Sequence, residues 1–431
     1  MEKLLETQEL YTDFNTFEGV VKALNGVSVH VNQGETYGLV GESGCGKSVT
    51  VRSMMRIVQS PGKIVGGKIL LFFREEDRSR GIDILTRSET YMTSMRGDDI
   101  SMIFQEASTS LNPVLSIGYQ VGESFNFHRR GQILKETVAE LEREISNTKF
   151  FLAKAWKTLQ RSLFKRELRV LNQYESQIDT TDDELYRLEN ERETASLRRK
   201  ALLRRRRDHL RETDVLIQFV KRVPFLALYA RRLDRTVRAQ VVELLRSLGV
   251  SNPERIAAGY PHELSGGMQQ RIVIAIALAC NPILLIADEP TSNLDVTIQA
   301  QIVDLIKSLK QTTISSVLFI THDLGLVAEV CDRASVMYAG DVAETASVRD
   351  LFHNPLHPYT QGLLRSVPKI QQADTLNTIP GVVPNLIHPP SGCRFHPRCP
   401  HAMDICAKEK PPTIEFAPGH TVACYLYTEN K

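Results

Sequence analysis

A glycine-rich segment carries the residue types that bind a chain of phosphates. It runs Gly41-Glu42-Ser43-Gly44-Cys45-Gly46-Lys47-Ser48-Val49, and its first eight residues fit the pattern G-x-x-x-x-G-K-[ST]. The glycines let backbone N–H groups point inward around phosphates, and a following helix presents its positive end to the same charge. Lys47 would reach the β- and γ-phosphates, and Ser48 would ligate Mg²⁺. The apolar run Thr36–Val40 directly before the segment disfavours the alternative, a glycine-rich turn that happens to include a lysine.

A second segment joins an apolar strand to two carboxylates. The run Ile283–Ala287 is followed directly by Asp288 and Glu289. An aspartate in this position can hold magnesium through water, and the adjacent glutamate can orient and deprotonate an attacking water. An apolar strand that ends in Asp-Glu is common by itself. Together with a phosphate loop in the same α/β domain, it predicts hydrolysis of a nucleoside triphosphate.

Cysteines form a third candidate site near the end of the sequence. Four of the seven cysteines crowd into 32 residues, namely Cys393, Cys399, Cys406 and Cys424. An odd count, and a Met1–Leu10 segment without the apolar core of an export signal, indicate a reducing compartment. In that setting such a cluster is more typical of a metal site than of disulfides. Four thiolates suit an iron–sulfur cluster or zinc, and the spacing alone does not choose between them.

Two stretches of the chain alternate strands with helices and must position these residues. In residues 1–128 we predict strands at Val27–Val31, Thr36–Val40, Ile69–Phe73 and Ile100–Phe104. In residues 236–350 we predict strands at Ile283–Ala287 and Ser316–Thr321, and helices at Gly266–Cys280 and Thr297–Lys310. The phosphate loop and the two carboxylates would therefore each follow a strand.

The overall composition sets broad limits. The chain has 431 residues, 42% of them hydrophobic and 24% charged, and a formal net charge of +2. These values indicate a globular protein with two or three domain-sized cores, and they exclude a collagen-like or wholly disordered chain. The longest apolar stretch, Ile272–Cys280, has nine residues, about half of what a membrane-spanning helix needs. Any work at a membrane would therefore depend on partners.

Residues 129–235 differ from the rest of the chain. They hold 26 Lys/Arg and 17 Asp/Glu, with apolar residues at helical spacing, such as Val138, Leu141 and Ile145. Capping residues at Thr180–Glu184 predict the start of a second long helix, folded back on the first, and a third short helix is predicted near Val215–Val223. The arginine runs at 198–200 and 204–207 could lie against anionic lipid headgroups. The alternative is a solvated hairpin whose arginines pair with its own glutamates.

Several motifs together resemble those of the ATP-binding cassette (ABC) proteins. Leu264-Ser265-Gly266-Gly267-Met268-Gln269-Gln270-Arg271 is similar to the family's signature motif, and Gln105 to its Q-loop glutamine. Ser292-Asn293-Leu294-Asp295 resembles the D-loop, although Asn293 replaces a small residue, and His322 matches the switch histidine. The motifs occur in the family's order across about residues 10–350, which makes the set far more specific than any one motif.

The resemblance implies a fold and a set of roles. The fold would be a P-loop ABC domain of α/β class, with a RecA-like core, a β-subdomain and a helical subdomain. Glu289, His322 and Gln105 would serve catalysis, and Ser48, Gln105 and Asp288 would hold magnesium. ATP would contact the segment Gly41–Val49 and the ring of Phe17, for which a place in the core is the alternative. The signature residues and the D-loop would face a second cassette, and the residues concerned are Ser265, Gly266, Gly267, Gln269 and Asp295.

The final stretch, residues 351–431, resembles a particular branch of this family. Asn354–Gln361 is similar to the extension found after the cassette in ATPases of oligopeptide, dipeptide and nickel importers. The four clustered cysteines resemble a set that binds a [4Fe–4S] cluster in the dipeptide-permease type. The resemblance therefore favours a [4Fe–4S] cluster at these cysteines, with zinc or unmetallated thiols as the alternatives. A cluster there would have a structural role in a short tail.

These features together predict the ATP-hydrolysing subunit of a peptide importer, with ATP and Mg²⁺ as its ligands. The resemblance implies a second, non-identical cassette, two permease subunits and an extracytoplasmic solute-binding protein as partners, and a place at the cytoplasmic face of the inner membrane. Chromosome-maintenance and double-strand-break-repair ATPases also carry a coiled coil between the halves of a cassette, which makes them the alternative. The importer-type tail argues against that alternative, and no nucleic acid is expected as a partner.

Overall fold

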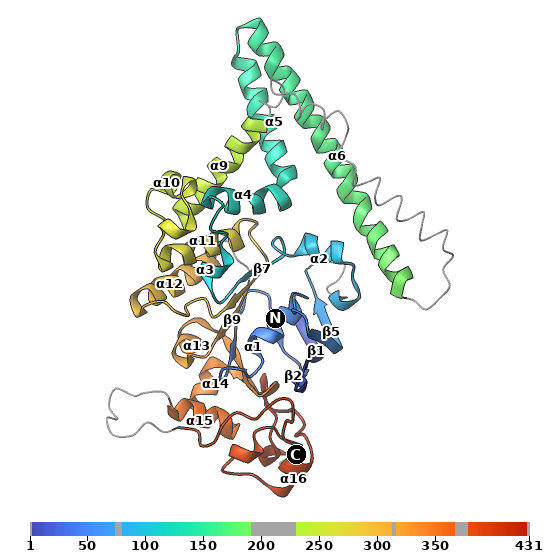
Figure 1. Ribbon diagram of the computed structural model, residues 1–431, viewed down its shortest axis with the longest axis vertical. Helices are drawn as coiled ribbons and strands as arrows, with labels where there is room; N and C mark the ends of the chain where they lie inside the picture. Colours follow the sequence, from blue (N-terminus) through green and yellow to red (C-terminus); the bar gives the residue numbers. More distant parts are fainter. Residues whose placement is uncertain (1, 74–79, 191–229, 313–315, 367–377, 429–431) are drawn as a thin grey trace. The chain divides into compact units, whose positions relative to one another are not determined.

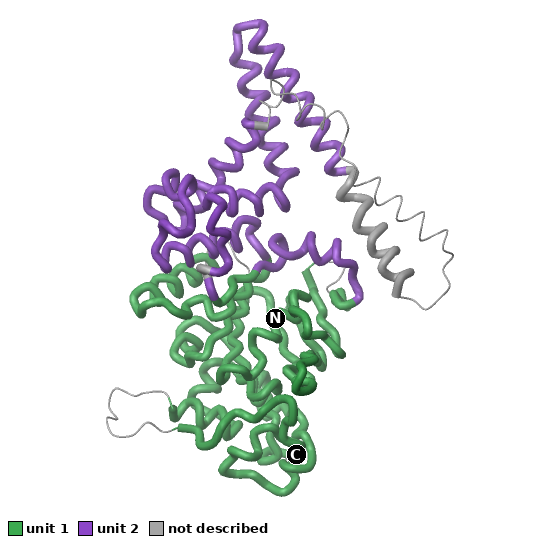
Figure 2. Tube along the Cα trace, in the orientation of Figure 1, with its two compact units in different colours: residues 1–85, 102–105, 283–431 green, residues 86–101, 106–282 purple. Residues whose placement is uncertain are grey.

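The computed structural model describes residues 2–73, 80–190, 230–312, 316–366 and 378–428. They form two compact units, which Figure 2 distinguishes by colour. Unit 1 contains residues 1–85, 102–105 and 283–431, and unit 2 contains residues 86–101 and 106–282. The predicted helix near Val215–Val223 and the arginine runs at 198–200 and 204–207 lie outside the described residues.

The larger sheet of unit 1 has parallel strands at its centre. Their order along the sheet is β10, β4, β9 and β8, with β7 (Ile100–Ile103) at the edge. The bounds of the four are Arg333–Tyr338, Thr36–Val40, Ser316–Thr321 and Leu284–Asp288. Every residue of β4, β8 and β9 is buried, in keeping with their continuous apolar runs. Because the carboxyl ends of parallel strands meet at one edge, the segments that follow β4, β8 and β9 lie together.

The smaller sheet of unit 1 is antiparallel and differs from the prediction. Its strands are β1 (Lys3–Thr16), β2 (Gly19–Val27), β3 (His30–Asn32), β5 (Gly62–Leu71) and β6 (Ile82–Asp83). The predicted strand Val27–Val31 is wrong, because it spans the end of β2 and the start of β3. At the break the Thr7 hydroxyl accepts the Val29 N–H (3.0 Å). The long β1 was not predicted, since its glutamates hide the alternation of apolar and polar residues.

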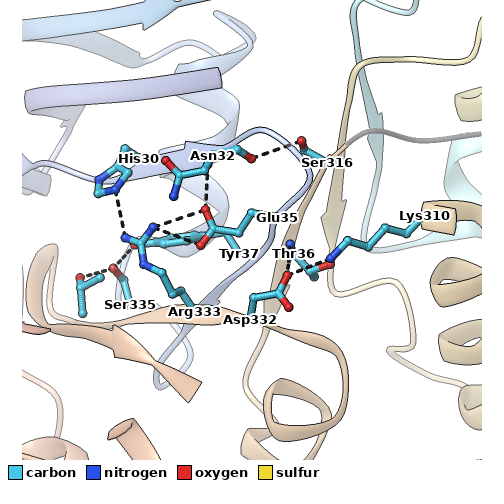
Figure 3. A network of polar contacts seen from close by, with 11 residues as sticks. His30, Asn32, Glu35, Thr36, Tyr37, Lys310, Ser316, Asp332, Arg333 and Ser335 are labelled. Carbon is cyan, nitrogen blue, oxygen red and sulfur yellow. Dashed lines mark hydrogen bonds and ion pairs between the residues drawn. The ribbon is translucent and has the colours of Figure 1, made fainter. Parts of the chain in front are cut away.

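A polar network fixes the start of β4, the strand that leads into the phosphate loop (Figure 3). The buried carboxylate of Glu35 accepts the N–H of Asn32 (2.8 Å) and pairs with Arg333 of β10 (3.1 Å). The same guanidinium bonds His30 (3.1 Å), and burial together with Arg333 lowers the pKa of His30 to about 4. The backbone N–H of Thr36 donates to Asp332 (2.8 Å). The network ties β4 to β10 at the end opposite to the phosphate loop.

The C-terminal tail adds to unit 1. After α14 (Val348–His353) and α15 (Pro358–Ser366), the chain returns as α16 (Asp404–Lys408), β12 (Ile414–Ala417) and β13 (His420–Val422). β13 pairs with β11 (Asp341–Ser347), so the tail extends the larger sheet by two strands. Glu344 of β11 is fully buried and accepts hydrogen bonds from the N–H groups of Leu356 and His357 (both 2.8 Å) and from His420 (2.8 Å). The tail is thereby held by buried polar contacts.

Unit 2 is mainly helical (Figure 1). Its helices include α2 (Glu89–Met95), α3 (Ala107–Ser110), α4 (Ile117–His128), α10 (Pro253–Ala258) and α11 (Gly266–Leu278). Residues 129–235 contribute α5 (Arg130–Asn147), α6 (Phe151–Asn190) and the first part of α9 (Ala230–Ser247). No helix of the described residues is long and apolar enough to span a membrane.

The insertion contains the predicted helical hairpin, but its turn lies elsewhere. The chain reverses at residues 148–150, and Thr180–Glu184 lies within α6 rather than at a helix start. Several described cations pair with glutamates of the insertion, as in Lys165–Glu142 (2.7 Å), Arg130–Glu167 (2.6 Å), Lys157–Glu144 (2.8 Å) and Arg232–Glu144 (3.0 Å). Hydrogen bonds from Arg232 and Lys157 lower the pKa of Glu144 to about 2. These pairs follow the pattern of the self-paired alternative, whereas the arginine runs for which it was stated lie outside the described residues.

Candidate active site

The phosphate loop joins β4 to α1 (Lys47–Met54), where the sequence predicted it. Gly41 lies at φ 158 and Gly46, the residue before α1, at φ 105. A Cβ at Gly41 would collide with the carbonyl oxygen of Met337, and one at Gly46 would lie 3.0 Å from the carbonyl oxygen of Ala23. Glycine is required at both positions because the loop passes against neighbouring backbone while in a conformation that side chains disfavour.

The side chain of Lys47 reaches back across the loop to its first two residues. Its side chain is buried, and its ammonium donates to the carbonyl oxygens of Gly41 (2.7 Å) and Glu42 (3.0 Å). The ammonium therefore lies inside the curve of the loop, where a phosphate chain would meet a cation together with N–H groups from the start of α1.

Ser48 and Asp288 meet, although 240 positions separate them. The Ser48 hydroxyl donates to Asp288 Oδ1 (2.9 Å). Asp288 is fully buried, and in the described part of the chain its second oxygen, Oδ2, is buried without a hydrogen-bond partner. A hydroxyl and a partly unsatisfied carboxylate are the oxygen donors that Mg²⁺ prefers. These residues therefore fit the magnesium ion that the sequence predicts.

Replacing Asp288 by asparagine should stabilise the protein without metal. Burial raises the pKa of Asp288, so the folded state favours the protonated form of this carboxyl. As pH rises through the folded-state pKa, the carboxyl must ionise while buried, and the free energy of unfolding falls. In EDTA at pH 7, we expect Asp288→Asn to raise the free energy of unfolding by about 1 kcal/mol, with the gain shrinking at acidic pH. Urea unfolding at several pH values would measure the change. Asp304→Asn on the exposed face of α12 (Val296–Thr312) is the control. Equal unfolding curves for Asp288→Asn and wild type would contradict the prediction.

Two predicted residues, Gln105 and His322, converge on the carboxylate of Glu289. The amide of Gln105 donates to Glu289 Oε2 (3.2 Å), and Nδ1 of His322 lies 3.4 Å from the same oxygen. Glu289 has φ 47, a conformation rare for residues other than glycine. Its N–H donates to the carbonyl oxygen of Ile320 (3.0 Å), and its own carbonyl oxygen accepts the N–H of Ser292 (3.1 Å). The backbone thereby holds the carboxylate at the edge of the sheet, between β8 and β9.

The D-loop residues shape the same edge. Asp295 accepts the N–H of Ile298 (3.0 Å) and so caps α12 (Val296–Thr312). The Ser292 hydroxyl donates to the backbone oxygen of Gln105 (2.8 Å), which ties the D-loop to the Q-loop. Asn293 lies at φ 61, and asparagine tolerates this left-handed region better than most residues. The departure from a small residue at this position therefore suits the local backbone.

The signature residues lie in unit 2, at the start of α11. Ser265 and Gly266 are exposed there, where the helix presents its positive end. Gln269 donates to the carbonyl oxygens of Pro261 (2.9 Å) and Leu264 (3.4 Å), so its amide braces the segment before the helix. Gly267 follows Gly266 in the first turn.

Phe17 lies in the turn between β1 and β2, and its side chain is fully exposed. The alternative that placed this ring in the core is therefore wrong. An exposed ring in unit 1 keeps the predicted stacking on adenine as a proposal.

Two residues of the tail contact the phosphate loop, and sequence reasoning missed both. Arg398 pairs with the carboxylate of Glu42 (2.8 and 3.3 Å), and the N–H of Glu42 donates to the hydroxyl of Tyr359 (3.1 Å). The Arg398 guanidinium also lies over the ring of Tyr338, 5.7 Å from its centroid. Tyr359 belongs to the segment Asn354–Gln361 that the sequence singled out, which was the one available signal.

The cysteines of the tail do not form the predicted metal site. Cys393, Cys399, Cys406 and Cys424 line one cavity of about 10 Å³, no larger than a single water requires. In the described residues, no group of three or more His, Cys, Asp or Glu side chains could hold a metal ion. Burial raises the pKa of the Cys393 and Cys424 thiols to about 11. The prediction of a [4Fe–4S] cluster or zinc is therefore wrong.

Buried arginines and strand pairing hold the tail instead. The side chain of Arg394 is buried and donates to the backbone oxygens of Ala339 and Lys22, with Asp341 3.6 Å from its Nε. Arg398 additionally donates to the backbone oxygens of Pro380 (2.9 Å) and Ile379 (3.2 Å).

Comparison with known proteins agrees with this geometry. The family described as "ABC transporter" matches residues 24–292, and the family described as "Oligopeptide/dipeptide transporter, C-terminal region" matches residues 343–406. The oligopeptide transport ATP-binding protein AppD of Bacillus subtilis (strain 168) is 40% identical over 431 residues, which cover 100% of this chain and 98% of the relative. The dipeptide transport ATP-binding protein DppD of the same organism is 36% identical over 428 residues, covering 99% and 95%.

Solved structures include a dimeric ATP-binding cassette in a post-hydrolysis state, bound to ADP and Pi. It is 19% identical, covers 80% of this chain and 99% of its own, and has a TM-score of 0.48. The two family matches and the full-length relatives establish the assignment: the chain belongs to the ABC transporter family, as an ATP-binding protein of the oligopeptide/dipeptide importer type.

Proposed function

We propose that this chain is the ATP-hydrolysing subunit of a peptide importer, working at the cytoplasmic face of the inner membrane. The observation that carries the chemistry is the convergence of Gln105 and His322 on Glu289, beside the Ser48–Asp288 pair. The full-length similarity to oligopeptide and dipeptide transport ATP-binding proteins supports peptides as the solute class. Chromosome-maintenance and DNA-repair ATPases find no support among the family matches and relatives reported above.

Each residue of the site has one task in this proposal. The phosphate loop and Lys47 bind the triphosphate, and Phe17 stacks on the adenine ring. Mg²⁺, when held by Ser48 and Asp288 with Gln105 nearby, would neutralise charge on the β- and γ-phosphates. Glu289 takes a proton from a water whose oxygen attacks the γ-phosphorus, and the bond to the β-phosphate oxygen breaks to give ADP and phosphate. His322 and Gln105 hold the Glu289 carboxylate in place for that proton transfer.

The proposal includes a second cassette, which would face this one across the bound nucleotides. Ser265, Gly266, Gly267 and Gln269 would serve the partner's nucleotide, and Asp295 would lie at the contact between the cassettes. The exposure of Ser265 and Gly266 at a helix start supports this assignment. We further propose that the second cassette is a non-identical paralogue, and that two permeases and an extracytoplasmic solute-binding protein complete the importer.

Affinity purification of the tagged chain from membranes in mild detergent tests this assembly. We expect two polytopic permeases and a second cassette to co-purify, as identified by mass spectrometry. In a strain that lacks the gene, the wild-type chain should restore uptake of a labelled peptide, and the Lys47→Ala chain at equal abundance should not. A soluble complex with nucleic acid, and no membrane subunits, would overturn the proposal.

A further inference from the structure

The turn between α5 and α6 exposes an apolar surface that the ATPase site does not use. Phe150, Phe151 and Leu152 are 75%, 80% and 73% exposed. Elsewhere in the described residues, no two adjacent residues are both exposed large hydrophobics. Single exposed apolar residues are ordinary, but three in succession at one end of a hairpin are not. Figure 1 shows this turn at the end of the hairpin that α5 and α6 form.

The charges around this turn are of one sign. Between Glu144 and Glu167 the sequence has no acidic residue and six basic ones, which are Lys149, Lys154, Lys157, Arg161, Lys165 and Arg166. Lys149 and Lys154 flank the apolar triplet and are exposed. In the part of the chain that the structure describes, neither of these two lysines pairs with a carboxylate. The apolar tip, defined here as residues 149–154, therefore combines aromatic and aliphatic side chains with two uncompensated cations.

We propose that the apolar tip inserts into the boundary between headgroups and acyl chains of a membrane leaflet that contains anionic lipid. Phenylalanine and leucine side chains are the type that enters this boundary, and lysine ammonium groups then reach the phosphates around them. Negative lipid attracts each nearby lysine, which adds to the apolar contribution. Neither contribution needs a shaped partner, only a surface with an apolar interior and negative charge.

A protein partner fits these residues less well. A stable protein interface buries on the order of 800 Å² on each side, with polar groups paired around an apolar centre. Three consecutive residues at a two-helix turn offer only a small apolar surface. Both charged residues of the tip, Lys149 and Lys154, are positive, and an anionic lipid surface attracts both. We therefore assign the tip to lipid, and a protein partner becomes an outcome of the test.

Ion pairs and buried apolar side chains hold together the part of the hairpin behind the tip. Glu144, one turn before the tip, receives both Lys157 of α6 (2.8 Å) and Arg232 of α9 (3.0 Å). Ile133, Leu134 and Leu141 of α5 are fully buried, as is Phe164 of α6. These apolar side chains behind the tip are thus buried within the protein, whereas those at the tip are exposed.

Tryptophan fluorescence offers a direct measurement, because Trp156 is the only tryptophan in the chain and lies in the first turns of α6. The purified full-length chain is titrated with vesicles of phosphatidylcholine, with or without phosphatidylglycerol, and binding is checked by co-sedimentation. We expect vesicles with phosphatidylglycerol to shift the emission to the blue and to sediment the protein. The combined change Phe150→Ser, Phe151→Ser and Leu152→Ser should lower the partition constant by at least about tenfold.

Matched variants separate the tip from general surface properties. Val65→Ser, Val114→Ser and Val382→Ser together remove three exposed apolar side chains that are scattered over the chain, and they should leave binding unchanged. Lys149→Gln with Lys154→Gln should weaken binding to anionic vesicles by about tenfold, whereas Lys63→Gln with Lys68→Gln should not. Far-UV circular dichroism confirms that each variant is folded.

Two results would overturn the proposal. One is equal vesicle binding by the tip variant and by the wild type. The other is absence of binding by the wild type to vesicles of either composition, combined with loss of permease co-purification in the tip variant, which would assign the tip to a protein. Both results are obtained without measuring ATP hydrolysis or peptide uptake, so failure here leaves the proposed importer function standing.

Discussion

Glu289→Gln should lower the ATPase rate of the assembled importer by about a thousandfold, while ATP still binds. Glutamine has the size of glutamate but cannot take a proton from water. The amide of Gln105 donates to Glu289 Oε2 over 3.2 Å, and a glutamine at position 289 can still offer an oxygen to that amide. The loop and the Ser48–Asp288 pair are untouched, so binding should persist. Phosphate release by the purified complex measures the rate, and a fluorescent ATP analogue measures affinity.

The control for Glu289→Gln is Glu409→Gln, at an exposed position of the tail in the same unit. It removes an identical charge away from the sheet edge and should leave the rate unchanged. If Glu289→Gln retained the wild-type rate in the assembled complex, Glu289 would not be the base. If it instead lost ATP affinity, the role of this residue would lie in binding.

Lys47→Ala should weaken ATP binding itself. The Lys47 ammonium donates to the carbonyl oxygens of Gly41 and Glu42 across the loop, where the triphosphate would lie. Hydrogen bonds to charged groups contribute about 1.5–3 kcal/mol each, so we expect the dissociation constant for ATP to rise roughly 10- to 100-fold. Isothermal titration calorimetry with a slowly hydrolysed ATP analogue would measure this constant.

Lys68→Ala, at an exposed position of β5, controls for the loss of one positive charge. It should bind ATP as the wild type does. Unchanged affinity in folded Lys47→Ala would contradict the phosphate-loop assignment. A variant with normal affinity but no turnover would move the role of Lys47 from binding to catalysis.

Local sequence was sufficient to predict those features whose structure depends on one short segment. The glycines at 41 and 46, with Lys47 and Ser48 after them, determine a loop and a helix start within eight residues, because backbone conformations and helix ends depend on near neighbours. The buried strands β4, β8 and β9 were likewise readable as continuous apolar runs. The long hairpin was recognised from its apolar spacing, but Thr180–Glu184 placed its turn wrongly. Capping residues favour a helix start and do not require one, and α6 runs through them.

Tertiary structure decided which distant segments meet. The family motifs assigned roles to Gln105, Glu289 and His322, but only the order of the strands brings the first and the last of these onto the carboxylate of Glu289. The contact of Arg398 with Glu42 joins positions 356 apart, and no local pattern contains it. The cysteines show the converse, since their spacing resembled a metal site, whereas in the described residues no group of three or more His, Cys, Asp or Glu side chains could hold a metal ion.

By itself, therefore, the sequence determined the phosphate loop, the strands that carry the site and the family of the chain, because those features depend on residues adjacent along the backbone. The packing of the tail on the phosphate loop, the nature of the cysteine cluster and the exposed apolar tip were decided by the folded chain. Each of these depends on which surfaces are covered and which remain exposed, and burial is a property of the whole fold.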